Sequence, residues 1–186
     1  MTTPTASVFI ATSLDGFIAR SDGALDWLPG EDPDNPEEDF GYEDFINSVD
    51  TLVMGRHTFE AVLGFEEWPH PGQRVVVLSS RPVTIPAALR DEPIEVLSAS
   101  PAEVMAHLAD TGARHVYVDG GRTIQGFLRA GLIHELIITR VPVLLGAGIA
   151  LFGELERDIA LRHLQTRDFA NGLVQSRYQL VNAGAS

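Results

Sequence analysis

The segment Val53-Met54-Gly55-Arg56-His57-Thr58 ends a short apolar run with a glycine and an arginine. The same pattern occurs twice more, in Val77-Leu78-Ser79-Ser80-Arg81-Pro82 and in Val118-Asp119-Gly120-Gly121-Arg122-Thr123. Each apolar run is typical of a buried strand. In open α/β folds, nucleotides bind at the carboxyl ends of parallel strands, where the amino ends of helices offer free N–H groups to anions. Three such segments therefore predict an α/β fold that holds a nucleotide carrying several phosphates.

Length and composition predict a single domain over residues 1–186, with a core from about residue 7 to residue 181. Hydrophobic residues make up 45% of the chain and charged residues 21%, a balance typical of soluble globular proteins. No apolar run is long enough to cross a bilayer, and residues 1–7 show neither a basic start nor an apolar core. We therefore expect a cytoplasmic protein without a membrane partner.

The formal net charge is −13, and acidic residues concentrate in residues 31–44. Proteins that bind nucleic acid present a basic face to the phosphates, so this charge argues against a nucleic-acid partner. An anionic ligand would have to be captured against the overall field, which makes the local arginines of the three segments more informative.

Two residue types are absent from the chain, cysteine and lysine, and all 13 basic residues other than histidine are arginines. The lack of cysteine excludes disulfides, thiolate nucleophiles and cysteine-based zinc sites. The lack of lysine excludes Schiff-base catalysis and a phosphate loop built on Gly-Lys-Ser/Thr. The six histidines show no paired metal-ligand spacing, so no metal site is expected.

The first two thirds of the chain alternate between strand-like and helix-like patterns. Ser100-Pro101-Ala102-Glu103 has the residues of a helix start with a capping box, and Gly112 is expected to end that helix. Residues 13–30 and the acidic stretch 31–39 are expected to be loops. The other expected strands span residues 7–12, 51–54, 75–78, 94–97 and 115–118, and the other expected helices span residues 42–49, 58–63 and 123–130.

The carboxyl-terminal part of the chain has a different pattern. Longer strands are expected over residues 135–143, 160–169 and 173–181. Asn171-Gly172 between the last two predicts a hairpin turn. The sequence thus predicts a mostly parallel central sheet with an antiparallel hairpin at its carboxyl-terminal edge.

Several of these motifs resemble a known family. Met54-Gly55-Arg56-His57-Thr58 and Leu78-Ser79-Ser80 are similar to the NADPH-binding segments of the dihydrofolate reductase fold. The resemblance narrows, over Val8 to about Leu180, to the reductase domain of the bifunctional riboflavin-biosynthesis deaminase-reductase. The motifs that carry this narrower resemblance are Ser13-Leu14-Asp15-Gly16-Phe17-Ile18-Ala19, Ala130-Gly131-Leu132-Ile133-His134-Glu135-Leu136, Pro142-Val143-Leu144-Leu145-Gly146-Ala147-Gly148 and Leu151-Phe152.

The resemblance implies a three-layer α/β/α fold and an NADPH-dependent reductase that transfers a hydride to a small heterocycle or its sugar adduct. In that family the substrate is 5-amino-6-(5-phosphoribosylamino)uracil. The deaminase half is missing, because its zinc site requires cysteine. A homodimer joined through the carboxyl-terminal strands is expected by analogy. Two alternatives stay open: dihydrofolate reductase proper, and a non-catalytic NADP-binding protein with this fold.

The resemblance also implies which residues hold the cofactor. Arg56 would reach the phosphate on the adenosine side, and Arg81 with its neighbouring serines would select the 2′-phosphate of NADP. The Gly120-Gly121 pair would let the backbone approach the pyrophosphate, and Asp119 is interpreted as a cap of that turn. The full predicted set is Ala11, Ile18, Ala19, Gly55, Arg56, Thr58, Leu78, Ser79, Ser80, Arg81, Gly120, Gly121, Arg122 and Thr123.

Three further residues are candidates for contact with the substrate. Asp15 is expected at the mouth of the site, where it would orient the substrate or relay a proton; an ordinary Asp-Gly turn is the alternative. Trp27 is expected either in the substrate pocket or in the core. Folate reduction places a carboxylate on the first helix, and an ungapped count back from Gly55 reaches Asp39, in the acidic loop. Dihydrofolate is therefore a doubtful substrate.

Overall fold

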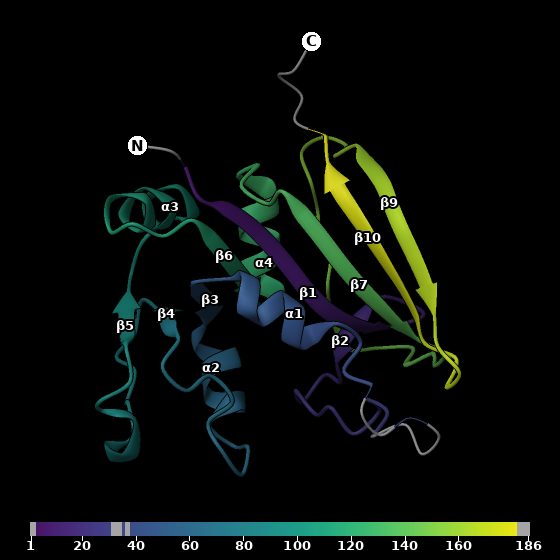
Figure 1. Cartoon of the computed structure of the whole chain (residues 1–186), viewed down its shortest axis with the longest axis horizontal. Coiled ribbons are helices and arrows are strands. Elements are labelled where there is room, and N and C mark those ends of the chain that lie inside the picture. The colour runs from purple at the N-terminus through teal and green to yellow at the C-terminus, as the bar shows by residue number, and fades with distance from the viewer. Residues whose placement is uncertain (1–2, 31–34, 36–37, 182–186) are drawn as a thin grey trace.

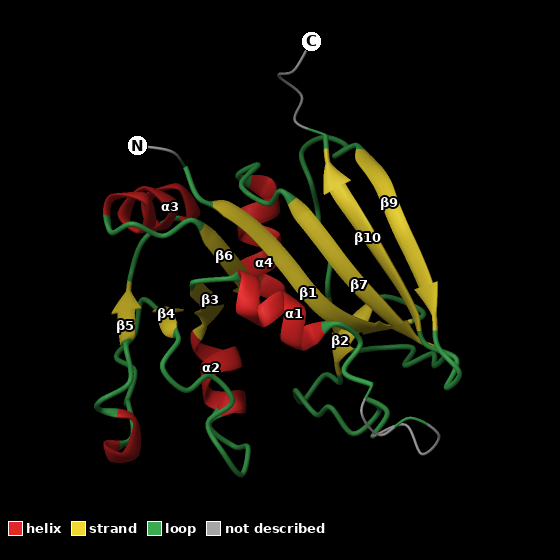
Figure 2. Ribbon diagram, viewed as in Figure 1, coloured by secondary structure: helices red, strands yellow, loops and turns green. Residues whose placement is uncertain are grey.

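A computed structural model describes residues 3–30, 35 and 38–181 of the chain. Its centre is an eight-stranded sheet in the order β5-β4-β3-β6-β1-β7-β10-β9 (Figures 1 and 2). Neighbouring strands from β5 to β7 run parallel, whereas β10 and β9 are antiparallel additions at one edge. The strands are β1 (Thr5–Ser13), β3 (Thr51–Gly55), β4 (Arg74–Leu78), β5 (Ile94–Leu97), β6 (His115–Asp119), β7 (Glu135–Val141), β9 (Leu161–Asp168) and β10 (Val174–Leu180).

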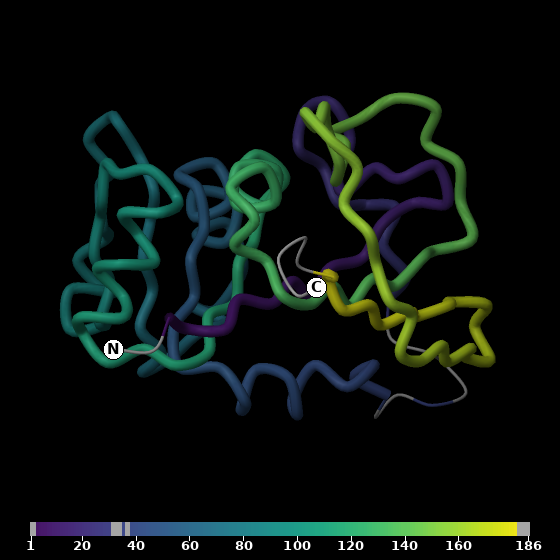
Figure 3. Tube along the Cα trace, turned by 90° about the horizontal axis from the view of Figure 1, so that it is seen from above, coloured from purple at the N-terminus to yellow at the C-terminus, as the bar shows by residue number. Residues whose placement is uncertain are grey.

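Helices cover both faces of this sheet, which gives the three layers predicted from the sequence. The helices α1 (Tyr42–Ser48) and α2 (Arg56–Val62) bury Phe45 and Phe59 on one face. The helices α3 (Pro101–Asp110) and α4 (Gly121–Arg129) contribute to the core on the opposite face. Seen from above, α1 and α4 lie on opposite sides of β1 (Figure 3).

The central residues of the inner strands β3 and β4 are apolar because both faces of these strands are covered. In β3, Val53 is fully buried in the cluster under α3 and α4, whereas its neighbours Leu52 and Met54 are fully buried in the cluster under α1 and α2. Val76 and its neighbours Val75 and Val77 in β4 divide between the two clusters in the same way. This alternation gives rigid strands that end at one edge of the sheet, where the three predicted segments begin.

The carboxyl-terminal hairpin is confirmed. β9 and β10 are joined by a turn in which Gly172 has a φ of 84°, a conformation that favours glycine. The backbone N–H of Phe169 donates to the carbonyl of Leu173 at 3.0 Å, and that of Gly172 donates to the carbonyl of Phe169 at 2.9 Å. The pattern of sequence therefore predicted both the turn and the antiparallel edge.

Several local expectations were wrong. Residues 13–30 contain a strand, β2 (Phe17–Ala19), which pairs with β8 (Ile149–Ala150) in a separate two-stranded sheet. Strands of two or three residues carry no readable periodicity, so the sequence gave no signal for them. A short 3₁₀ helix, η1 (Ala87–Leu89), interrupts the expected loop before β5, and α2 and α4 each begin two residues earlier than predicted.

Two expectations concern membranes and metals. Among the described residues, no helix is long and apolar enough to cross a bilayer. Within the same part of the chain, no three carboxylate or histidine side chains come together as metal ligands. The expected acidic loop falls largely at residues 31–34 and 36–37, which lie outside the described part of the structure.

Candidate functional site

The β3–α2 and β6–α4 junctions pack against each other, and each contributes a glycine that makes room for a threonine of the other. A Cβ on Gly55 would lie 2.9 Å from the Thr123 Oγ1 atom. A Cβ on Gly120 would clash with Thr58 Oγ1, and Gly120 also has a φ of 90°. The two segments are therefore fitted to one another at the carboxyl ends of adjacent strands.

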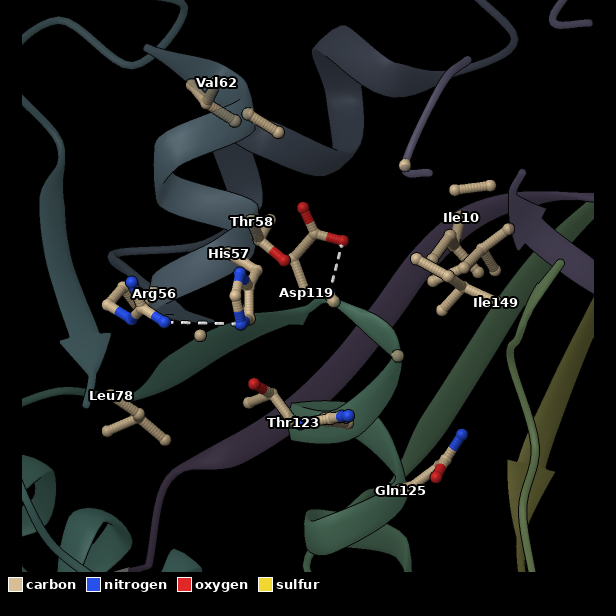
Figure 4. Close-up of a pocket in the computed structure, with 18 of the residues that line it drawn as sticks. Ile10, Arg56, His57, Thr58, Val62, Leu78, Asp119, Thr123, Gln125 and Ile149 are labelled. Atoms are coloured by element: carbon tan, nitrogen blue, oxygen red, sulfur yellow. Dashed lines mark hydrogen bonds between the residues drawn. The ribbon is translucent and has the colours of Figure 1, made fainter. Parts of the chain in front are cut away.

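One cavity of about 1430 Å³ lies at this edge of the sheet. Figure 4 shows Asp119 in its wall, with Arg56 and Leu78 on one side of that residue and Ile10 and Ile149 on the other. All of the residues predicted to hold the cofactor line this cavity. The three phosphate-type segments and the residues from β1 and β2 thus come together, although their role in binding stays a prediction.

Three arginines line the cavity, and each comes from one of the three segments. Arg56 donates to Glu60, one turn along α2, at 2.8 Å. Arg81 and Arg122 are exposed, and no carboxylate of the described residues lies within ion-pair distance of either. Two guanidinium groups are therefore available to an anion.

The serines of the second segment form a local turn as well as lining the cavity. The Ser79 hydroxyl donates to the carbonyl of Arg81 at 2.7 Å and accepts from the backbone N–H of Arg81 at 3.1 Å. This turn presents Ser80 and the Arg81 side chain at the surface. Ser79 thus fixes the shape of the loop that carries the cation.

The small β2–β8 sheet packs against Gly121, at one side of the amino end of α4. A Cβ on Gly121 would lie 3.1 Å from the carbonyl oxygen of Ala150 and 3.1 Å from Ile18 Cδ1. The Gln125 amide of α4 donates to the same Ala150 carbonyl at 3.0 Å. The absence of a side chain at Gly121 therefore leaves room for residues Ile18 and Ala150 of this small sheet. The sequence predicted that a ligand would approach Gly121, and in the structure these two residues lie close to it.

Asp119 ends β6 and lies at the centre of the cavity wall. Its Oδ1 accepts the backbone N–H of Gly120 at 2.8 Å, as the capping interpretation predicted. Burial raises the pKa of the Asp119 carboxyl to about 6, with the Gly120 hydrogen bond opposing this shift. The Tyr42 side chain also lines the cavity, and burial together with the charge of Asp119 raises the pKa of its phenol to about 12. The site therefore contains a carboxyl that exchanges its proton near neutral pH.

Asp15 lies outside the residues that line the cavity. Its Oδ1 accepts from the Ser13 hydroxyl at 2.6 Å and from the Leu145 N–H at 3.1 Å, and its Oδ2 accepts from the Gly146 N–H at 2.7 Å. The Ser13 hydrogen bond, followed by those from the two backbone groups, holds the pKa of Asp15 below its usual value. Asp15 connects the turn after β1 to residues 145–146, so it does not occupy the position at the mouth that the sequence predicted.

The other two substrate candidates also lie away from the cavity. Trp27 is buried in a small cluster with Val141 and Leu173, which agrees with the core alternative. The carboxylate of Asp39 accepts the N–H groups of Gly41 at 2.9 Å and Glu43 at 2.7 Å, and thus caps the start of α1. Because Asp39 does not line the cavity, the structure does not supply at this position the carboxylate that a folate site requires.

Several residues that line the cavity were not predicted. Tyr42 is the first residue of α1, and the aromatic-polar pattern of that helix gave no sign that this side chain faces a cavity. His70 lies in an irregular segment where periodicity is uninformative, and it is 6% exposed. Leu25 and Leu28 follow β2 and are exposed at the rim. Asp119 belongs to the third segment, but the sequence predicted for it only a cap of the following turn and not a place in the cavity wall.

Comparisons with known proteins agree with the fold. YwjB of Bacillus subtilis (strain 168), itself an uncharacterized protein, is 35% identical over 92% of this chain and 95% of its own length. A crystal structure of a putative riboflavin biosynthesis protein from Shewanella sp. PV-4 is 38% identical, with a TM-score of 0.87 over 96% of this chain and 99% of that one.

A more distant structure shows the fold alone. It is a diaminohydroxyphosphoribosylaminopyrimidine deaminase/5-amino-6-(5-phosphoribosylamino)uracil reductase from Thermotoga maritima, at 14% identity and a TM-score of 0.74. The match covers 96% of this chain and 57% of that longer one, and the shared architecture is the dihydrofolate reductase-like fold. The model of the RibD C-terminal domain family matches residues 4–175. The chain therefore belongs to the RibD C-terminal domain family.

Proposed function

We propose that this protein is an NADPH-dependent reductase that acts on a small planar heterocycle or its sugar adduct. Membership of a family named for a reductase of riboflavin biosynthesis supports an oxidoreductase of this kind. The observation that carries the proposal is the single cavity into which all the predicted cofactor residues converge. Three segments that end in glycine or serine and arginine surround one space at the carboxyl edge of a parallel sheet.

The chemistry and size of the cavity suit a phosphorylated dinucleotide. Pockets for one drug-sized ligand usually measure roughly 300–1,000 Å³, so a cavity of about 1430 Å³ has room for a dinucleotide and a second molecule. Arg81 and Arg122 offer guanidinium donors to phosphate groups, and the amino end of α4 offers backbone N–H groups. Thr58 and Thr123 also line the cavity, and each adds a hydroxyl group.

The residues of this chain would position the reactants and handle one proton. When bound, NADPH supplies the hydride. Ala11, Ile18 and Ala19 provide apolar walls that exclude water from one end of the cavity. Asp119 holds a proton on its carboxyl at a pKa of about 6, close enough to neutral pH for it to be given up to a substrate atom. Asp15 is less suited to that step, because its hydrogen bonds favour the ionised form.

Binding of the cofactor is the first test. Calorimetric titration of the whole chain with NADPH and NADH should give saturable heat with NADPH and much weaker heat with NADH. Oxidation of NADPH is then followed with a panel of pyrimidines, pterins and their ribosides. Absence of heat with both NADPH and NADP⁺ would overturn the proposal. Tight NADPH binding without turnover of any compound would favour the non-catalytic alternative.

A further inference from the structure

The cavity has two chemically different ends. Its three arginines, Arg56, Arg81 and Arg122, come from the first turns of α2 and α4 and from the loop after β4. Figure 4 shows Arg56 on the Leu78 side of Asp119, away from Ile10 and Ile149. These cations belong to the segments assigned above to the dinucleotide.

The other end is apolar, aromatic and acidic. Val62 and Phe65 lie at and beyond the carboxyl end of α2, which separates them from Arg56 by more than one helical turn. Apart from the three arginines, the Asp and Arg side chains that line the cavity are Asp22 and Asp119, and both are acidic. The cavity lining outside the three segments also includes Ile10, Leu25, Leu28, Tyr42, Pro69 and His70.

His70 does not supply a positive charge there. Burial lowers the pKa of its imidazole, so the ring is neutral near pH 7. Its Nδ1 atom is buried and has no hydrogen-bond partner among the described residues. Leaving Nδ1 unprotonated places the ring proton on Nε2 and avoids a buried N–H without an acceptor.

No arginine other than Arg56, Arg81 and Arg122 lines the cavity. All 13 basic residues other than histidine are arginines, and none of them lies in the undescribed residues 1–2, 31–34, 36–37 and 182–186. Arg20 lies next to the rim segment in sequence, but its guanidinium forms hydrogen bonds of 2.6 and 3.0 Å with Asp26. A phosphate at this end would therefore face two acidic side chains, Asp22 and Asp119, without a guanidinium or ammonium partner in the cavity lining.

We propose that the substrate of this chain is an uncharged or cationic planar heterocycle without a phosphate group, in contrast to the phosphoribosylated pyrimidine of the riboflavin pathway. This inference rests on the proposed function, because it assigns the cationic end to the dinucleotide. An unpaired phosphate in a partly desolvated acidic pocket is strongly disfavoured. A neutral ring meets no such penalty.

The polar groups at this end suit the edge of such a ring. The Tyr42 hydroxyl stays protonated and can donate a hydrogen bond, the neutral His70 offers one ring nitrogen as a donor, and Asp119 offers a carboxyl. Heterocycles with ring nitrogens and exocyclic carbonyl or amino groups present complementary acceptors and donors. Phe65 and Leu28 provide apolar contact for the faces of the ring.

The test compares one compound with and without its phosphate. 5-Amino-6-(5-phosphoribosylamino)uracil and its phosphatase-treated riboside are assayed for NADPH oxidation and for binding to the NADP⁺-loaded protein, beside a panel of unphosphorylated pyrimidines and pterins. The riboside or a free heterocycle should exceed the phosphate ester at least about tenfold in kcat/KM or affinity. Preference for the ester, or failure of every unphosphorylated compound to bind, would overturn the inference.

A designed cation provides an independent arm of the test. Leu28→Arg introduces a guanidinium at the acidic end and should shift the ratio of ester to riboside at least about tenfold toward the ester. Leu28→Gln is the control for altered shape and should leave that ratio unchanged. Absence of NADP⁺ binding to the unmodified protein would instead contradict the proposed function. Failure of the proposed function and failure of this inference are therefore distinguishable. An unshifted ratio in Leu28→Arg, with NADP⁺ still bound, would count against the inference alone.

Discussion

The raised pKa of the Asp119 carboxyl bears on both the stability of the fold and the proposed proton transfer. Its folded-state pKa of about 6 lies above the ordinary value of 3.8, so the folded protein binds this proton more tightly than the unfolded chain does. The stabilisation is present below pH 3.8 and is lost as the pH rises to about 6. Asp119→Asn should therefore gain stability relative to the parent across this window, by up to about 3 kcal/mol. Denaturant unfolding above and below the window checks this.

Asp119→Asn also distinguishes two roles of this residue, donation of a proton to the substrate and capping of the turn at Gly120. If Asp119 supplies the proton, the kcat of the parent falls above pH 6 or so, and Asp119→Asn is slow and lacks this limb of the profile. Asp110→Asn, at the exposed end of α3, is the control and should change neither measurement. An Asp119→Asn variant that keeps the parent's rate and pH profile would exclude the proton role.

Arg81 carries the predicted selectivity for the 2′-phosphate. Removing its guanidinium by Arg81→Ala should weaken NADPH binding by roughly 1.5–3 kcal/mol, the usual contribution of a hydrogen bond to a charged group. NADH lacks this phosphate, so its affinity should change little. Arg90→Ala, at an exposed arginine that does not line the cavity, is the control. Equal losses for the two cofactors in calorimetry would contradict the assignment.

At the scale of elements, the β3–α2 and β6–α4 junctions pack closely against each other at the cavity, with Gly120 against Thr58. Gly120→Ala combines a strained φ of 90° with a clash against Thr58. Gly112 has nearly the same φ, 89°, with nothing within 4 Å of a Cβ, so Gly112→Ala measures the backbone cost alone, about 1–2 kcal/mol. We expect Gly120→Ala to lose at least about 1 kcal/mol more in chemical unfolding. Equal losses would mean that Thr58 rotates away at no cost.

Asp15 connects two elements, and its loss should be seen in the loop that it anchors. Asp15→Ala removes the acceptor for the N–H groups of Leu145 and Gly146, so the exchange of these two amides with deuterium should accelerate at least about tenfold. Amides in β7 serve as the internal control. A catalytic role would instead alter the pH dependence of kcat while leaving amide protection unchanged.

The elements that the sequence predicted are those with strong local patterns. The buried strands ending at Met54, Leu78 and Val118 and the Asn171-Gly172 turn follow directly from apolar runs and turn chemistry. The convergence of the three segments also follows, because parallel strands end at one edge of a sheet. The pairing of Phe17–Ala19 with Ile149–Ala150 depends on contacts 130 residues apart and leaves no local trace. The sequence also did not predict the contacts of Asp15 and Asp39, because an aspartate carboxylate can accept a hydrogen bond from a backbone N–H group or from a substrate.

At the scale of the whole molecule, β9 forms one edge of the main sheet, and among the described residues only β10 pairs with it. All eight residues of β9 are exposed, including Leu161 and Leu164 at 44% each. An exposed edge strand with apolar side chains is available for pairing with another chain. We therefore expect a homodimer formed through the β9–β10 hairpin, with twice the mass of the chain in light scattering. Leu164→Glu should weaken it at least about tenfold, and Leu155→Glu is the control. A monomeric parent protein at all concentrations would contradict this.

The position of β1 at the middle of the sheet has a consequence for biosynthesis. Thr5 pairs with His115, and Ser7 through Ser13 pair with residues 135–141, so β1 finds its neighbours only after about 100 later residues have been synthesised. Until then the nascent chain carries an unsatisfied, strongly apolar amino-terminal segment that is prone to aggregate. The ladder of β3, β4 and β5 can form before β1 is paired, so the pace of elongation through β6 and β7 sets how long the apolar strand β1 stays without partners.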